Sequence, residues 1–92
     1  MNIKQLIENV RSSALENGEI GLAAACTGKS RINNLCASVD DIVDAFDDMD
    51  VEDEVNAIGE CALELILLSE VLGHSFEECL LSAYEHYYKK QN

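Results

Sequence analysis

Residues 30–73 read SRINNLCASVDDIVDAFDDMDVEDEVNAIGECALELILLSEVLG and contain the pattern that decides the fold. From residue 30 to residue 48, apolar side chains recur at the i, i+3, i+4 and i+7 positions of a helix with one apolar face. The acidic segment 47–50 ends this helix, and Asp50 is placed to cap a second helix that runs to Leu72 and stops at Gly73. Because the connection is short, the stretch predicts two antiparallel helices.

A further helix is predicted on each side of this pair. Residues 2–16 carry an apolar face and are followed by an Asn-Gly pair, which suits a left-handed helix end. Residues 20–27 are small and apolar, and they fit either a short helix or a packed loop. Ser75 and Glu78 have the spacing of a capping box, and the apolar stripe that follows is expected to enter the core. That stripe comprises Phe76, Cys79, Leu80, Ala83, Tyr84 and Tyr87.

The composition agrees with one all-α domain over residues 1–92. Proline is absent, aromatic residues make up 5% and only five glycines occur, which disfavours a sandwich or barrel. No run approaches the roughly 18 apolar residues of a membrane span and no secretory signal is visible, so a cytoplasmic protein without membrane contact is expected. A net charge of -12 disfavours direct binding of nucleic acid. Buried, reduced thiols are expected at Cys26, Cys36, Cys61 and Cys79.

The helix predicted at residues 50–72 is apolar on more than one side between Ala57 and Leu68. In a small domain, such a helix usually buries one side in its own core and the other side against a partner subunit. We therefore expect a homodimer or a tetramer that is built on the two central helices. Leu67 is taken as an outward-facing position of that interface.

The acidic residues are concentrated in one part of the chain. Residues 40–54 hold nine of the eighteen acids and contain no Lys or Arg. Asp41 and Asp44 are three residues apart and share a helix face, and antiparallel pairing brings this face near Glu60. Crowded carboxylates repel one another unless a divalent cation neutralises them, and hard oxygen ligands suit Mg²⁺ or Mn²⁺. The spacing by itself also fits a solvated acidic face, and both interpretations stay open at this point.

The segment EDEVNAIGECALELILLSEVLGHSFEECLLSAYEHYYKK, residues 52–90, resembles the C-terminal half of MazG-like nucleoside triphosphate pyrophosphohydrolases. The small members from phages and mobile elements are the most similar in style. Upstream, SVDDIVDAF at residues 38–46 resembles the family's E-E-x-x-E segment with every Glu shortened to Asp. The resemblance covers almost the whole chain and implies a four-helix MazG-like domain. The matching words are Ala57-Ile58-Gly59-Glu60, Leu72-Gly73, Phe76-Glu77-Glu78-Cys79-Leu80 and Ala83-Tyr84.

The resemblance also implies a Mg²⁺ site, because the family takes its metal ligands from an E-x-x-E on one helix and an E-x-x-D on the next. The matching acids in this chain are Asp41, Asp44 and Glu60. The remaining ligand position falls on Ala57, which cannot bind a metal. Asn56 beside it, or Asp53 one turn earlier, is the expected substitute.

The activity that the resemblance implies is hydrolysis of a nucleoside triphosphate to the nucleoside monophosphate and pyrophosphate. Mg²⁺, or Mn²⁺ in its place, neutralises the triphosphate and activates a water molecule. Asp40 or Asp44 orients that water for attack on the α-phosphorus. Lys29 and Arg31, which precede the acidic helix, are expected to contact phosphate oxygens.

Two other functions stay open on the sequence. With the ligand at Ala57 lost, the same fold would act as a binding or regulatory protein without hydrolysis. The strong negative charge alone also fits an acidic mimic of nucleic acid that blocks a basic protein. Tight functional binding of Mg²⁺ with pyrophosphate release would separate the enzyme from both.

Overall fold

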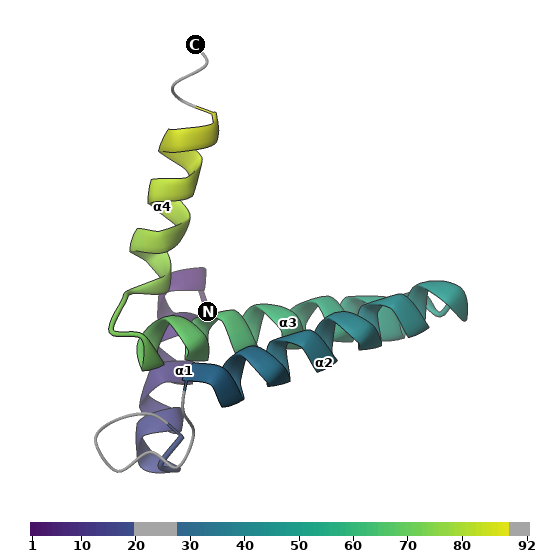
Figure 1. Cartoon of the computed structure of the whole chain (residues 1–92), viewed down its shortest axis with the longest axis horizontal. Coiled ribbons are helices and arrows are strands. Elements are labelled where there is room, and N and C mark those ends of the chain that lie inside the picture. Colours follow the sequence, from purple (N-terminus) through teal and green to yellow (C-terminus); the bar gives the residue numbers. More distant parts are fainter. Residues whose placement is uncertain (20–27, 89–92) are drawn as a thin grey trace.

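The computed structural model describes residues 1–19 and 28–88, and in these ranges it contains four helices and no strand. They are α1 (Ile3–Glu16), α2 (Gly28–Asp47), α3 (Val51–Val71) and α4 (Phe76–Tyr87). Figure 1 shows α2 and α3 side by side, with α1 crossing them and α4 projecting from the end of α3. The predicted all-α class with four helices is confirmed. Within the described ranges, none of these helices has the length and apolar character that a membrane crossing requires.

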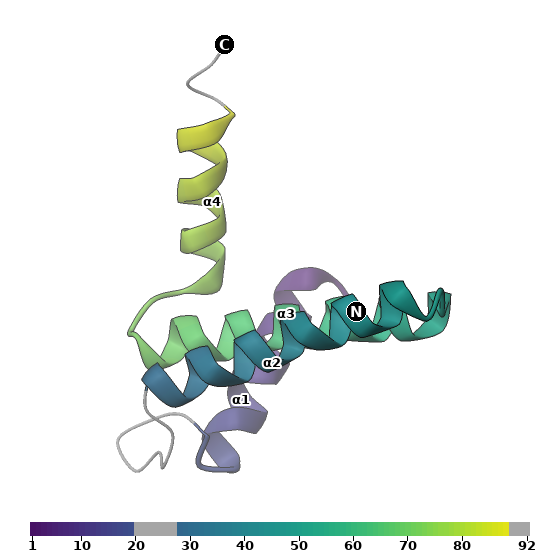
Figure 2. The same cartoon turned by 45° about the vertical axis from the view of Figure 1, so that its right-hand side comes forward.

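The connection between α2 and α3 is a tight turn over residues 48–50. Met49 has a left-handed backbone conformation with φ of 55°, and the amide of Asp50 donates to the carbonyl of Ala45 at 3.2 Å. The Asp50 carboxylate accepts from the backbone N–H of Asp53 at 3.0 Å, so the predicted N-cap is confirmed. The chain therefore reverses direction within a few residues, and α2 and α3 run antiparallel in both views (Figures 1 and 2).

The predicted boundary between α3 and α4 is also confirmed. Gly73 follows α3 with φ of 82°, a conformation that side chains disfavour and glycine adopts without strain. The hydroxyl of Ser75 then accepts from the backbone N–H of Glu78 at 3.4 Å and caps α4. The connection between the two helices is short, and α4 leaves the end of α3 in a new direction (Figure 2).

In the hairpin of α2 and α3, one stripe of side chains on each helix packs against the other helix. Buried and half-buried positions recur three and four residues apart, as in an antiparallel coiled coil. On α2 these positions are Arg31, Leu35, Ser38, Ile42 and Ala45. On α3 they are Glu54, Ala57, Cys61, Glu64 and Leu68. The apolar face predicted for α2 is therefore divided, since Ile32, Cys36, Val39, Val43 and Phe46 remain exposed.

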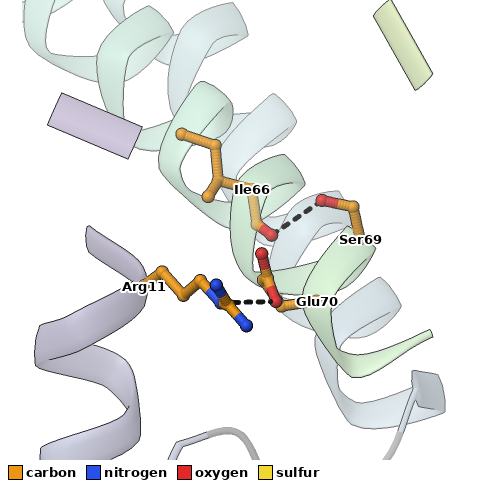
Figure 3. Close-up of polar contacts among 4 residues, drawn as sticks. All are labelled: Arg11, Ile66, Ser69 and Glu70. Atoms are coloured by element: carbon orange, nitrogen blue, oxygen red, sulfur yellow. Dashed lines mark hydrogen bonds and ion pairs between the residues drawn. The ribbon is translucent and has the colours of Figure 1, made fainter. Parts of the chain in front are cut away.

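α1 lies across the other side of α3 and covers part of it. Ala14, which is only 2% exposed, forms a core with Leu67, and Val10 and Val71 pack against them. The expectation that Leu67 faces outward is therefore wrong, because α1 covers this position. An ion pair strengthens the same contact, with 3.2 Å between Arg11 Nε and Glu70 Oε2 (Figure 3).

A buried polar side chain in this region is also satisfied within its own helix. Ser69 is buried, and its hydroxyl donates to the carbonyl oxygen of Ile66 at 2.8 Å (Figure 3). Back-bonding of this kind within a helix removes the cost of an unpaired hydroxyl. Ser69 can therefore be buried on α3 without a hydrogen-bond partner from another helix.

A charged pair lies inside the hairpin at the end where α4 departs. Arg31 Nη1 of α2 lies 3.1 Å from Glu64 Oε2 of α3, and the two side chains are 6% and 22% exposed. Such a pair contributes modestly as a whole, but removal of one partner leaves a buried charge uncompensated. The pair therefore sets the alignment of α2 against α3.

We expect Glu64→Gln to lower the free energy of unfolding by about 2 kcal/mol, because it leaves the Arg31 guanidinium buried beside a neutral group. Arg11→Met is the matched control, since its pair with Glu70 lies at a side chain that is 59% exposed. We expect that control to cost about 0.5 kcal/mol, as exposed pairs do. Chemical denaturation of both variants measures the difference, and equal costs would contradict a structural role for the buried pair.

The apolar stripe of α4 does not enter the core of the chain. None of the residues of α4 is buried, and Leu80, Tyr84 and Tyr87 are 59%, 55% and 62% exposed. The expectation of a core stripe is therefore wrong for the single chain, because α4 projects away from α2 and α3 (Figures 1 and 2). Ile3 and Ile7 of α1 share an open hollow with Leu80 and Tyr84, but they leave this face of α4 exposed.

The cysteines differ from the sequence expectation in a similar way. Cys36, Cys61 and Cys79 are free thiols, but Cys36 and Cys79 are exposed and only Cys61 is half-buried. The prediction of buried thiols is wrong for the two exposed residues, because they lie on faces that no other helix of the described chain covers. Cys26 and the alternatives for residues 20–27 lie outside the described residues.

Candidate functional site

An open acidic groove runs between α2 and α3 in the half of the hairpin nearest the turn. Its volume is about 350 Å³. The residues that line it are Asp41, Asp44, Ala45 and Asp48 of α2 and its end, with Asp53, Asn56, Ala57 and Glu60 of α3. The two alanines are buried at its floor, and the acids form its walls. We call this feature the acidic groove.

The register of the hairpin explains why these acids meet. Asp41 and Asp44 each precede a packed position of α2 by one residue, and Asp53, Asn56 and Glu60 do the same on α3. In two antiparallel helices, positions one residue before the packed stripe point to the same face of the pair. The acids of α2 and α3 therefore line one face, although they come from opposite chain directions.

Small residues keep this groove accessible. Ala45 and Ala57 are 5% and 6% exposed, and both lie at packed positions of their helices. Because an alanine side chain extends no further than one methyl group, the acids beside it stand above the floor of the groove. The alanine at position 57 is therefore a packing residue, and its neighbours Asn56 and Asp53 provide the polar atoms.

The electrostatics of the groove favour a cation. Five carboxylates line it, and no cationic side chain does among the described residues. Two like charges 4 Å apart repel by about 1 kcal/mol even in water, so each added carboxylate raises the cost of the empty groove. Asp50, the neighbouring acid, is occupied as the cap of α3. Among the described residues, the groove is thus a concentrated patch of negative charge without an internal counter-ion.

The donor atoms suit a hard divalent cation, because carboxylate and amide oxygens are the ligands that Mg²⁺ and Mn²⁺ prefer. Within residues 1–19 and 28–88, however, no three Asp, Glu, His or Cys side chains converge on a single point as metal ligands do. Asp41, Asp44, Asp53 and Glu60 are all exposed. Exposed side chains exchange rotamers within nanoseconds, so these acids are free to turn toward a bound ion.

The structure brings together five of the residues predicted for the site. Asp41, Asp44, Asp53, Asn56 and Glu60 all line the acidic groove. They line one groove because the short turn imposes an antiparallel register on α2 and α3.

Asp40 does not line the groove, and Asp48 does. Asp40 is exposed and precedes Asp41 by one residue, so it points about 100° away around the helix. From the sequence, Asp48 is expected in the segment that ends the helix and is not among the predicted site residues. Its spacing is the signal that identifies it, because Asp48 follows Asp44 by four residues and Asp41 by seven, which keeps all three on one helix face.

The two predicted phosphate ligands lie at the other end of α2. At 1.5 Å per residue, Arg31 is about 15 Å along the helix from Asp41. Its guanidinium is buried and bonded to Glu64, which gives it a structural role within the chain. Lys29 is exposed in the first turn of α2, and its contact with phosphate stays a prediction.

Comparison of the chain with models of protein families, with curated proteins and with solved structures finds no match. The assignment of function therefore rests on the residues of the acidic groove and on their arrangement in the hairpin. The exposed apolar side chains of the helices are the second observation on which this assignment draws.

Proposed function

We propose that the protein is a Mg²⁺-dependent nucleoside triphosphate pyrophosphohydrolase of the MazG-like type. The observation that carries this proposal is the meeting of Asp41 and Asp44 of α2 with Glu60 of α3 in one open groove. These are the acids that the resemblance to the family singles out. The four-helix fold, with the acids on its two central helices, supports the same assignment.

In this proposal, Asp41, Asp44 and Glu60 would hold Mg²⁺, and Asp53 and Asn56 would complete the set of oxygen donors in place of Ala57. The bound ion supplies charge neutralisation for the triphosphate and makes water a better nucleophile at neutral pH. Mn²⁺ suits the same donors. Without a cation, the five carboxylates of the groove would repel a triphosphate, so the substrate binds together with its metal.

The chain's own part in the reaction is to orient water and phosphate. A carboxylate of the groove, Asp44, or its neighbour Asp40, accepts a hydrogen bond from the attacking water and takes its proton. The water oxygen forms a bond to the α-phosphorus while the bond from that phosphorus to the bridging oxygen breaks. The products are the nucleoside monophosphate and pyrophosphate, with the bridging oxygen leaving on the pyrophosphate.

We also propose that the protein works as a homo-oligomer through the face of the hairpin opposite the acidic groove. The positions one residue after the packed stripes lie on that face in both helices. On α2 they are Ile32, Cys36, Val39, Val43 and Phe46. On α3 they are Val55, Ile58, Ala62 and Leu65. All of these side chains are exposed, and none is charged.

A second copy of the chain is the occupant that fits this apolar face. The net charge is -12, so two copies associate most favourably where neither presents an acid, and this face meets that condition. A symmetric pair of hairpins would form a bundle of four helices with the acidic grooves on its two outer sides. Burial of these exposed apolar side chains contributes roughly 1 kcal/mol each before the costs of association.

A pyrophosphate-release assay tests the proposed activity. The protein is supplied with canonical and modified nucleoside triphosphates in Mg²⁺ or Mn²⁺, and pyrophosphate and orthophosphate are measured separately. Pyrophosphate with an equal amount of nucleoside monophosphate supports the proposal, provided that a chelator stops the reaction. Metal binding without hydrolysis of any nucleotide would overturn it and would instead identify a binding protein on the same fold.

Divalent cations should stabilise the fold. A cation that binds only the folded state adds about 2.7 kcal/mol at a hundredfold excess over its Kd. For a domain of this size, that corresponds to a rise of about 10 °C or more in the melting temperature. We expect this rise with Mg²⁺ or Mn²⁺ and a smaller one with Na⁺ at matched ionic strength. Equal responses to the two salts would mean charge screening without a site.

A further inference from the structure

A second hollow adjoins the acidic groove where α1 crosses α3 (Figure 1), and its volume is about 430 Å³. The residues that line it are Leu6 of α1 with Val55, Asn56, Gly59, Glu60 and Leu63 of α3. Asn56 and Glu60 also line the acidic groove, so the two spaces share an edge. The remaining four residues are apolar or lack a side chain, and we call this feature the apolar hollow.

The helical geometry of α3 places the polar and apolar linings next to each other. Gly59 and Leu63 follow Asn56 and Glu60 by three residues each. Three residues advance about 300° around a helix, so each apolar position lies about 60° from the polar position before it. The surface therefore changes from carboxylate and amide oxygens to apolar carbon over about 5 Å along α3.

Gly59 keeps the apolar hollow open. It lies inside α3 and is not among the glycines with positive φ, and a Cβ added to it would meet no atom within 4 Å. Neither the backbone conformation nor close packing therefore requires glycine, although glycine inside a helix costs up to about 1 kcal/mol relative to alanine. What the missing side chain provides is open space beside Leu6 and Leu63.

We propose that the apolar hollow receives the nucleoside of the nucleotide whose phosphates the acidic groove takes, an inference that rests on the proposed function, and that Gly59 admits it. Such a ligand is charged at one end and carries a planar, largely apolar group at the other, which is the order in which α3 presents its two linings. Small-molecule sites measure roughly 300 to 1,000 Å³ and combine apolar walls with a few polar groups. The apolar hollow meets both conditions, with the Asn56 amide at its border.

Calorimetric titration of Gly59→Leu tests this subsite. The ligands are inorganic triphosphate and α,β-methylene analogues of nucleoside triphosphates, which the proposed reaction cannot cleave, each with Mg²⁺. We expect the unaltered protein to bind at least one analogue about tenfold more tightly than inorganic triphosphate, because apolar contact adds to phosphate binding. Gly59→Leu should abolish that preference, since its side chain fills the hollow. Its affinity for inorganic triphosphate should stay within about twofold of the unaltered protein.

The variant should fold at least as stably as the unaltered protein, because leucine is a better helix former than glycine and the space beside Gly59 is open. Asn33→Leu is the control, since it adds the same side chain at an exposed position of α2 that lines neither the groove nor the hollow. We expect it to leave both affinities unchanged. Leu6→Ala removes an apolar wall from the other helix and should weaken binding of the analogue alone, by about threefold.

The outcomes separate this subsite from the proposed hydrolysis. The inference is overturned if Gly59→Leu keeps the preference for the analogue or weakens both ligands alike, since the hollow would then hold no nucleoside. It is also overturned if the unaltered protein binds the two ligands equally. Binding of the analogue that depends on Gly59, without pyrophosphate release from any nucleotide, would support the subsite and refute hydrolysis. If neither ligand binds, the subsite and the proposed function fall together.

Discussion

Asp41→Asn, Asp44→Asn and Glu60→Gln should each lower turnover at least about 10²-fold, which corresponds to about 2.7 kcal/mol of lost transition-state stabilisation. Each change removes one negative oxygen donor from the acidic groove, where the three acids come together from α2 and α3. Each variant keeps the shape of the side chain. The loss should therefore appear in turnover and metal affinity and leave the fold intact, since fewer like charges remain to repel one another.

Asp47→Asn is the matched control for these variants. It makes the same chemical change on the same helix, but Asp47 is exposed and does not line the acidic groove. We expect its turnover to stay within about twofold of the unaltered protein, since no metal ligand is lost. Asp48→Asn should give an intermediate loss, because Asp48 lines the groove near the turn. Equal turnover in all five variants would leave the groove as a solvated acidic face and end the proposal of hydrolysis.

A charge on the apolar face of the hairpin should have the next largest effect. We expect Val43→Glu and Ile58→Glu each to weaken the hairpin contact at least about a hundredfold, which is about 2.8 kcal/mol of binding free energy. These residues are 50% and 58% exposed in the single chain, so a charge there costs little until a partner buries it. The isolated chain should keep its helical content while the assembly dissociates.

Asn33→Glu is the control for the hairpin contact. Asn33 is exposed one residue beyond the apolar stripe of α2, on the side of the helix that faces away from α3. Light scattering of the three variants at micromolar concentration measures the size of each assembly. If the unaltered protein is itself a monodisperse monomer at this concentration, the proposed partner of the apolar face is wrong.

The helices and their ends could be predicted because they depend on neighbours in the chain. Asp50 and Ser75 cap α3 and α4 through contacts to residues three positions ahead, and such contacts are visible in a linear sequence. The antiparallel direction of α2 and α3 could also be predicted from local sequence, namely from the short connection between them. A short connection leaves two long helices little choice but to run antiparallel.

The faces of the helices were harder to assign from the sequence. Leu67 and Leu65 both belong to the apolar run of α3, yet Leu67 is 8% exposed beneath α1 and Leu65 is 38% exposed. Hydrophobicity shows that both prefer burial, but not which other helix provides it. For the same reason, the stripe of α4 resembled a core stripe although no helix among the described residues of its own chain covers it.

The sequence by itself determined that nine acids crowd residues 40–54, because that is a matter of composition. Only the tertiary structure decided which of these acids act together. The antiparallel register places Asp48 in the groove, leaves Asp40 outside it and buries Arg31 against Glu64, 33 residues away in the sequence. The physical reason is that a helix separates neighbouring residues by about 100° around its axis, while packing two helices brings distant residues to one face.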